Sequence, residues 1–246
     1  EANMESNTVR IPAYKFRGEL YTDTTELVQA LASDWDNGKK QLYRGLLTGF
    51  FMACDPEIAE ACMDAEDSVT KRGENEDVAV WKLLYKMSPD VNTLFWKNQM
   101  YESLNVFGTD LMEKLRSGNV DECPVWNEML SYGLISSYMK AHKFSEAQVK
   151  GAESIESSVR LNKANAKTMA LNYYLLAYLI SGDRGFVLAG KQFDSIDVLA
   201  ELMNTLLTSS FDKFDVFCKN IIGVDNSLDP PFEAWLIAPG KSNEIE

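Results

Sequence analysis

One short pattern occurs three times along this chain, and it constrains the fold more than any other feature. The stretch "YKFRGELYTD" begins at residue 14; moved along by 80 residues it aligns with "LFWKNQMYES", and moved by 172 it aligns with "FVLAGKQFDS". Each copy joins two short apolar runs through a turn and continues into helix-patterned sequence. Internal repetition of this kind is typical of folds built from stacked structural units.

The three copies agree at the positions that local geometry selects. The turn position holds a residue type that tolerates a positive φ angle in each copy: Gly18, Asn98 and Gly190. A strong helix N-cap follows in each copy: Asp23, Ser103 and Ser195. After the first cap, Leu27, Leu31 and Trp35 form one apolar stripe at helical spacing. The pattern therefore predicts a β-hairpin that leads directly into a capped amphipathic helix.

Later parts of the unit repeat more loosely. "LYRGLLTGFF" resembles "LSYGLISSYM", with Gly45 matched to Gly133, and "LLYKMSPD" resembles "LAYLISGD", with Tyr85 matched to Tyr178. The last two segments each lead into the next hairpin. We therefore predict one continuous domain with an N-terminal tail and three repeat units, the third truncated: 1–13, 14–93, 94–185 and 186–246.

Helix-period patterning fills the sequence between the hairpins. The expected helices are 23–36, 38–53, 56–71 and 75–87 in the first unit, 103–117, 125–142, 145–161 and 164–181 in the second, and 195–208 and 211–221 in the third. "LDPP" then predicts a break before a short terminal helix. No segment alternates long enough for a central sheet. The sequence thus predicts a mostly α fold of stacked helical units, each headed by a small β-hairpin, in about three diverged repeats.

The first unit also resembles a known kind of protein segment. The resemblance rests on Phe16, Gly18, Tyr21, Leu27, Trp35, Gly45 and the stretch "DPEIAEACMDAED". This string is similar to helical-repeat segments of uncharacterised bacterial proteins, mainly from anaerobes, which stand alone or are attached to kinase-like or chaperone-like domains. It covers the first unit well and the others weakly. The resemblance implies a non-catalytic module in a regulatory or stress protein and transfers no functional residues.

Composition excludes several classes of partner. The 246 residues carry a net charge of −13, and nucleic-acid binding needs clustered Lys and Arg instead. The same charge disfavours adsorption to anionic membranes. The longest apolar run, "LNYYLLAYLI", is far shorter than the roughly 20 residues that span a bilayer. The opening "EANMESNTVR" lacks a basic and then apolar segment, so no signal peptide is predicted.

No residue pattern predicts catalysis, a cofactor or a metal site. The four cysteines contain no Cys-x-x-Cys pair, and His142 is the single histidine, which disfavours zinc and indicates free thiols in a reducing, cytoplasmic setting. The acids between 55 and 77 could in principle bind a divalent cation. Because Ile58, Cys62 and Ala65 occupy the inner positions of that helix, a solvated acidic face is the better interpretation. Ser210 and Lys213 match a Ser-x-x-Lys pair, a pattern that is common by chance.

Two hypotheses for function remain open at this stage. The leading one is a protein-interaction or regulatory module whose stacked units offer a face to a protein or peptide, and the acidic charge favours a basic partner. The alternative is an enzyme with an acid- or hydroxyl-based site in a groove between repeats. Trp235, in the short terminal helix, is expected either to cap the core or to serve as a docking contact for a partner.

Overall fold

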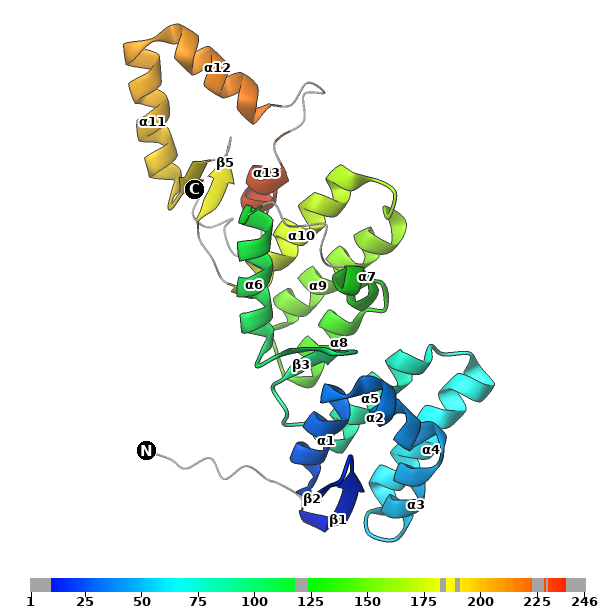
Figure 1. Cartoon of the computed structure of the whole chain (residues 1–246). Helices are drawn as coiled ribbons and strands as arrows, with labels where there is room; N and C mark the ends of the chain where they lie inside the picture. The colour runs from blue at the N-terminus through cyan, green and yellow to red at the C-terminus, as the bar shows by residue number, and fades with distance from the viewer. Residues whose placement is uncertain are drawn as a thin grey trace, which may run out of the picture. The chain divides into compact units, whose positions relative to one another are not determined.

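We describe a computed structural model of the chain in which residues 10–117, 124–181, 185–188, 191–222, 228 and 230–237 are described. These residues are mostly α-helical, with short antiparallel hairpins β1–β2, β3–β4 and β5–β6 (Figure 1). The chain divides into two compact units, residues 1–103 and 104–246. Within the described residues, no helix combines the length and apolarity that crossing a membrane requires.

The first unit contains two hairpins and five helices among its described residues. Its elements are β1 (Arg10–Phe16), β2 (Glu19–Asp23), α1 (Thr24–Ser33), α2 (Trp35–Tyr43), α3 (Leu46–Met52), α4 (Pro56–Arg72), α5 (Glu76–Met87), β3 (Leu94–Trp96) and β4 (Gln99–Tyr101). In the first hairpin Phe16 pairs with Glu19. The two turn residues between them have positive φ, 51° at Arg17 and 89° at Gly18, as a tight two-residue hairpin turn requires.

The second unit begins with a helix and ends with one. Its described elements are α6 (Leu104–Ser117), α7 (Pro124–Ser131), α8 (Leu134–Ala141), α9 (Glu146–Leu161), α10 (Ala166–Ser181), β5 (Phe186–Leu188), β6 (Lys191–Phe193), α11 (Ile196–Ser209), α12 (Phe211–Ile221) and α13 (Pro230–Ile237). The cap expected at Ser195 is present, since its side chain accepts from the backbone N–H of Val198. Asp23 caps α1 in the same way through the N–H of Glu26. Ser103 directly precedes α6.

Most helix positions agree with the sequence-based expectation, but two expected helices are each broken in the middle. The expected helix 38–53 is α2 and α3, and the expected helix 125–142 is α7 and α8. The break lies at Gly45 in one case and Gly133 in the other, both with φ of 70°. A left-handed glycine ends one helix and redirects the chain into the next. The repeat pattern aligns these two glycines, but it does not predict that each of them ends a helix.

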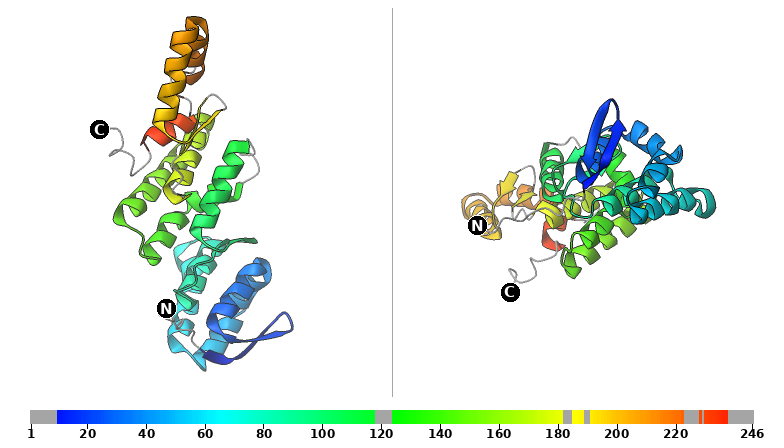
Figure 2. Two further views of the ribbon diagram at one scale, coloured as in Figure 1. Left: turned by 90° about the vertical axis from the view of Figure 1, so that its left-hand side faces the viewer. Right: turned by 90° about the horizontal axis from the view of Figure 1, so that it is seen from below.

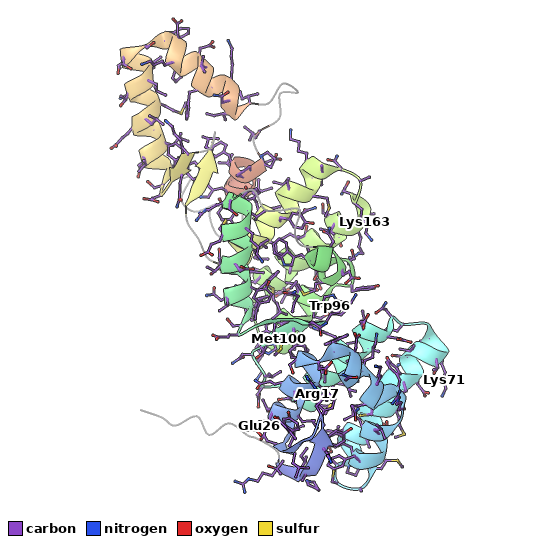
Figure 3. The ribbon with its side chains drawn as sticks, viewed as in Figure 1. Arg17, Glu26, Lys71, Trp96, Met100 and Lys163 are labelled. Atoms are coloured by element: carbon purple, nitrogen blue, oxygen red, sulfur yellow. The ribbon has the colours of Figure 1, made fainter. Side chains whose placement is uncertain are left out.

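The second hairpin packs on the first unit. Asn98, expected to be the positive-φ residue of this turn, accepts a hydrogen bond from the backbone N–H of Trp35 at 3.3 Å, and the positive φ of 53° falls on its neighbour Lys97. The rings of Trp35 and Trp96 lie 5.9 Å apart, and Figure 3 labels Trp96 and Met100 of this hairpin. The compact unit therefore extends past the predicted boundary at 93/94. Gly190 and the long loop expected at 118–123 lie outside the described residues.

Each core is built from the apolar stripes that the sequence predicted. In the first unit Leu27, Leu31 and Trp35 are at most 2% exposed, and in the second Phe107, Leu111 and Leu115 are at most 3% exposed. The first helix of each unit is covered by a later helix of the same unit, because α5 packs on α1 and α10 packs on α6. Trp81 and Trp126 are also buried, as expected for aromatic residues on apolar stripes.

The turn at Gly18 generates a stability prediction. Gly18→Val should lower the free energy of unfolding by ~1–2 kcal/mol, because a β-branched residue is strained at positive φ. Space is not the obstacle, since a Cβ atom at Gly18 would meet nothing within 4 Å. Gly18→Asn should be tolerated much better, because asparagine enters the left-handed region easily. Denaturant unfolding measures both variants, and equal stability of the two would contradict the hairpin assignment.

Candidate interaction surface

The most connected polar group in the first unit is Asp77, in the first turn of α5. One of its carboxylate oxygens accepts from Trp35 Nε1 at 2.8 Å and from Lys39 Nζ at 2.9 Å, and Lys97 Nζ lies 3.8 Å from the other. Burial alone would raise the pKa of Asp77, but the hydrogen bonds from Lys39 and Trp35 and the neighbouring charges outweigh it and lower the pKa. A carboxylate held ionised by these donors ties α2, α5 and the second hairpin together and is structural.

The most deeply buried carboxylate of the second unit is Glu156, on α9. It is 2% exposed and accepts from the backbone N–H of Ser136 at 2.9 Å and from its hydroxyl at 2.6 Å. These groups belong to the first turn of α8, just after Gly133. Burial raises the pKa of Glu156, although the Ser136 hydrogen bonds and the charge of Arg160 oppose the shift. The Glu156 carboxylate, from the neighbouring helix α9, therefore accepts hydrogen bonds at the first turn of α8, where backbone N–H groups have no partner within the helix.

The first unit contains a counterpart of this contact. Thr48, in the first turn of α3 after Gly45, donates its hydroxyl to Glu66 on α4 at 3.5 Å. Burial also raises the pKa of Glu66. Sequence reasoning missed both pairs, but a signal was present: once the two left-handed glycines are aligned, Thr48 falls on Ser136, and once the starts of α4 and α9 are aligned, Glu66 falls on Glu156.

A groove runs between α4 and α5. It consists of two adjoining cavities of about 430 Å³ and about 570 Å³ that share Ala61, Asp64 and Lys86. Small side chains such as Ala61 leave the space open. Asp64 is paired with Arg72 at 2.9 Å and with Lys86 at 3.3 Å, and their hydrogen bonds lower its pKa. Asp64 is therefore held ionised by two cations, and the groove lining as a whole has more acids than bases: Asp55, Glu57, Glu60, Asp64 and Glu74 against Arg72, Lys82 and Lys86.

Two more cavities adjoin exposed parts of the chain. One of about 530 Å³ is bordered by Tyr132, Arg160 and Met169, and one of about 730 Å³ lies beside the first hairpin and the start of α1. The residues with the strongest pKa shifts are absent from the linings of these cavities and of the α4–α5 groove. Burial raises the pKa of Tyr14, Cys62 and Tyr138 to about 12 in each case, as expected for groups in an apolar core.

The helical pair α11–α12 exposes many large apolar side chains. On α11, Ile196 is 41% exposed and Leu207 49%, and on α12, Phe211 is 68% exposed and Val216 58%. The views in Figures 1 and 2 agree that the pair extends away from α6 and α10. Large exposed apolar patches mark interaction sites on soluble proteins. This surface is the strongest candidate for function in the described part of the chain.

Trp235 has a structural place. It is 4% exposed, its ring lies 4.4 Å from that of Phe186 in the third hairpin, and α13 packs on α10. Of the two expectations for this residue, capping the core agrees with the structure, and a docking contact would require the buried ring to leave its site. His142 is the C-cap of α8, where Nδ1 lies 2.9 Å from the carbonyl oxygen of Tyr138.

Comparison of the chain with protein-family models, with curated proteins and with solved structures found no match. The function is therefore inferred from the geometry of the described residues. In the described ranges, no group of three or more His, Cys, Asp or Glu side chains is arranged to hold a metal ion.

The buried Glu156 generates a pH prediction. Because folding raises its pKa, the folded state favours the protonated carboxyl group. That contribution to stability is present in full below the unfolded pKa of about 4.3 and is lost as the pH rises through the folded pKa. We therefore expect Glu156→Gln to gain stability relative to the native chain as the pH rises from about 4 to neutrality. Urea unfolding across this range measures it; Glu113→Gln, at an exposed position of α6, is the control, and a relative loss for Glu156→Gln would contradict the assignment.

Metal addition should leave thermal stability unchanged. A ligand that binds only the folded state raises the melting midpoint, and the acids of α4 lie along a helix instead of surrounding a loop as calcium ligands do. We expect the same midpoint with chelator, with added zinc and with added calcium, measured by scanning calorimetry. A clear rise with calcium would show that the acidic stretch 55–77 binds the ion.

Proposed function

We propose that this chain is a non-catalytic protein-interaction module built from about three stacked hairpin-plus-helix repeats. It acts by holding an acidic, partly apolar surface in a fixed shape for a protein or peptide partner. The helical-repeat resemblance of the first unit and the regulatory or stress context that it implies agree with this role. The function is carried above all by the exposed apolar surface of α11–α12.

The same helix caps and hydroxyl–carboxylate contacts recur at matched places in the two units, which supports the repeat part of the proposal. Side chains cap the long helices at matched places, Asp55 before α4 and Ser145 before α9. Asn75 caps α5 through the N–H groups of Asp77 and Val78, and Asn165 accepts from the N–H of Thr168 in the first turn of α10. A hydroxyl–carboxylate contact follows the left-handed glycine in both units. Helices that are not related by repetition are not expected to share these caps and contacts in the same order.

The exposed surface of α11–α12 supports the interaction part. Only Leu199 of α11 and Phe217 of α12 are buried, although both helices have apolar residues at helical spacing. Exposed apolar area of this extent stays costly in water until another surface covers it. The groups with raised pKa values are explained by core burial, so they give an enzymatic role no separate support.

Charge and thiol chemistry bear on the partner and its location. With a net charge of −13, the chain attracts basic segments at long range and repels nucleic acid. Cys54, Cys62 and Cys218 are free thiols, which are usual in a reducing compartment. We therefore place the module in the cytoplasm with a basic protein or peptide as its partner.

Affinity capture tests the proposed function. The full chain is immobilised and incubated with extract of its source cells, and bound proteins are identified by mass spectrometry. We expect a small set of proteins that bind in near-stoichiometric amount and dissociate more readily as the salt concentration rises, because salt screens the electrostatic part of binding. The matched control is the same chain unfolded by acid and immobilised.

Two results would count against the function. Recovery of the same proteins by folded and unfolded chain would show non-specific adsorption. Recovery of nothing above the empty matrix, in extracts of both growing and stressed cells, would contradict an interaction module. Neither result depends on which surface of the module contacts the partner.

A further inference from the structure

The helical sequence after each hairpin has a stripe of four positions with the spacing i, i+4, i+7 and i+11, although in the first copy the fourth residue, Trp35, is the first residue of α2 and not part of α1. Aligned through the hairpins, the stripes are Thr24, Val28, Leu31 and Trp35 in the first copy, Leu104, Gly108, Leu111 and Leu115 in the second, and Ile196, Ala200, Met203 and Leu207 in the third. We call the third set the α11 stripe. In α6 and α11, which each contain all four of their positions, such spacing places the four residues on one face of the helix.

The first two stripes are covered along their whole length. Thr24, Val28, Leu31 and Trp35 are at most 2% exposed, and Leu104, Leu111 and Leu115 at most 3%. The α11 stripe differs, because Ile196 is 41% exposed and Leu207 is 49% exposed. Ala200 is also exposed and Met203 is only half-buried. The same face is therefore core in two copies and open in the third.

The helices that cover the first two stripes are α5 and α10, and each runs antiparallel to the stripe that it covers. Near the start of α1, Thr25 Oγ1 lies 2.8 Å from Oγ of Ser88, just after α5, whereas Asp77 at the start of α5 binds Trp35. In the second unit, Tyr174 on α10 donates to the carbonyl oxygen of Leu115, near the end of α6. In the described residues, α12 contacts α11, but no helix lies along α11 as extensively as α10 lies along α6.

In the second copy a small residue of the stripe, Gly108, lets the covering helix approach closely, whereas the matched residue of the first copy is Val28. At Gly108 a Cβ atom would lie 2.5 Å from Cγ2 of Ile180, so α10 lies against the backbone of α6. The matched residue of the α11 stripe is Ala200, which is small enough to let a helix approach closely. Close approach of two helices at small residues gives extensive van der Waals contact.

Building on the proposed function, we propose that the α11 stripe is the docking site for one amphipathic α-helix of a partner protein, which has an apolar stripe and basic flanks and lies antiparallel to α11. It would occupy on α11 the place that α10 occupies on α6. The helix-in-groove mode of recognition has this form.

Charge selects a basic partner helix over a second copy of this chain. The residues of α11 include Asp197 and Glu201, both exposed, and no Lys or Arg. A partner helix with lysines or arginines beside its apolar stripe would be attracted to them, whereas a second copy carries the same net charge of −13 and would be repelled.

The test uses the full chain and a defined helical probe. The probe is a fluorescent peptide with the α10 sequence 165–181 and four added lysines, and a second probe carries four glutamates instead. Fluorescence anisotropy measures their dissociation constants. We expect the lysine probe to bind at least about tenfold more tightly than the glutamate probe at low salt, with the difference shrinking as salt is added.

Matched variants locate the site. Ala200→Arg places a charge in the middle of the α11 stripe and should weaken binding of the lysine probe at least about tenfold. Thr205→Arg adds the same charge to the opposite face of α11, where Thr205 is exposed, and should change binding by less than about twofold. Circular dichroism confirms that both variants fold. A nitroxide at the C-terminus of the probe should broaden the NMR signals of Ile196 more than those of Leu207, and a nitroxide at its N-terminus should do the reverse.

Four outcomes would overturn the inference. They are no binding of the lysine probe, binding that Ala200→Arg leaves unchanged, a parallel orientation of the probe, and self-association of the native chain that Ala200→Arg abolishes, which would make a second copy the occupant. If cellular partners are captured equally by native chain and Ala200→Arg, the module still binds proteins but through another surface, so the two failures are distinguishable.

Discussion

Burial of the apolar stripe on α1 and α6 is the interaction on which the rest of each unit depends. A hairpin is too small to be stable alone, and a single helix of this length is marginal in water. When α5 lies along α1, or α10 along α6, the hairpin and the helix gain a shared core. The antiparallel direction of the two helices then fixes where the intervening helices must turn. The left-handed glycines at 45 and 133, with φ of 70°, make those turns, and Glu66 and Glu156 reach across to the first turn of the helix that follows each of them.

Much of this organisation could be predicted from the sequence because it depends on local chemistry. Asp23 and Ser195 are caps as expected, and the stripe residues from Leu27 to Trp35 are buried as expected. The breaks at Gly45 and Gly133 were missed, since a glycine inside a helical pattern is also tolerated as a helical residue and only tertiary packing decides between the two. The same limit applies to Asn98, where the positive φ falls on Lys97 instead.

The candidate site was the hardest part to predict, for a physical reason. An apolar stripe has the same sequence whether a neighbouring helix covers it or not, so the residues of α11 resemble those of α6 although Leu115 is buried and Leu207 is exposed. Trp235 shows the converse, because the sequence left open whether it caps the core or contacts a partner, and only the fold places its ring against Phe186. Exposure is a property of the whole fold and cannot be assigned from the pattern of one helix.

The docking of the second hairpin has a consequence for how such chains can be built. By sequence, "LFWKNQMYES" begins a new copy of the pattern, but Trp96 and Asn98 pack on the copy before it. The sequence pattern and the compact unit of residues 1–103 therefore end at different places. A fragment cut at the sequence boundary after Thr93 would keep α1 to α5 but would lack the hairpin that packs on Trp35.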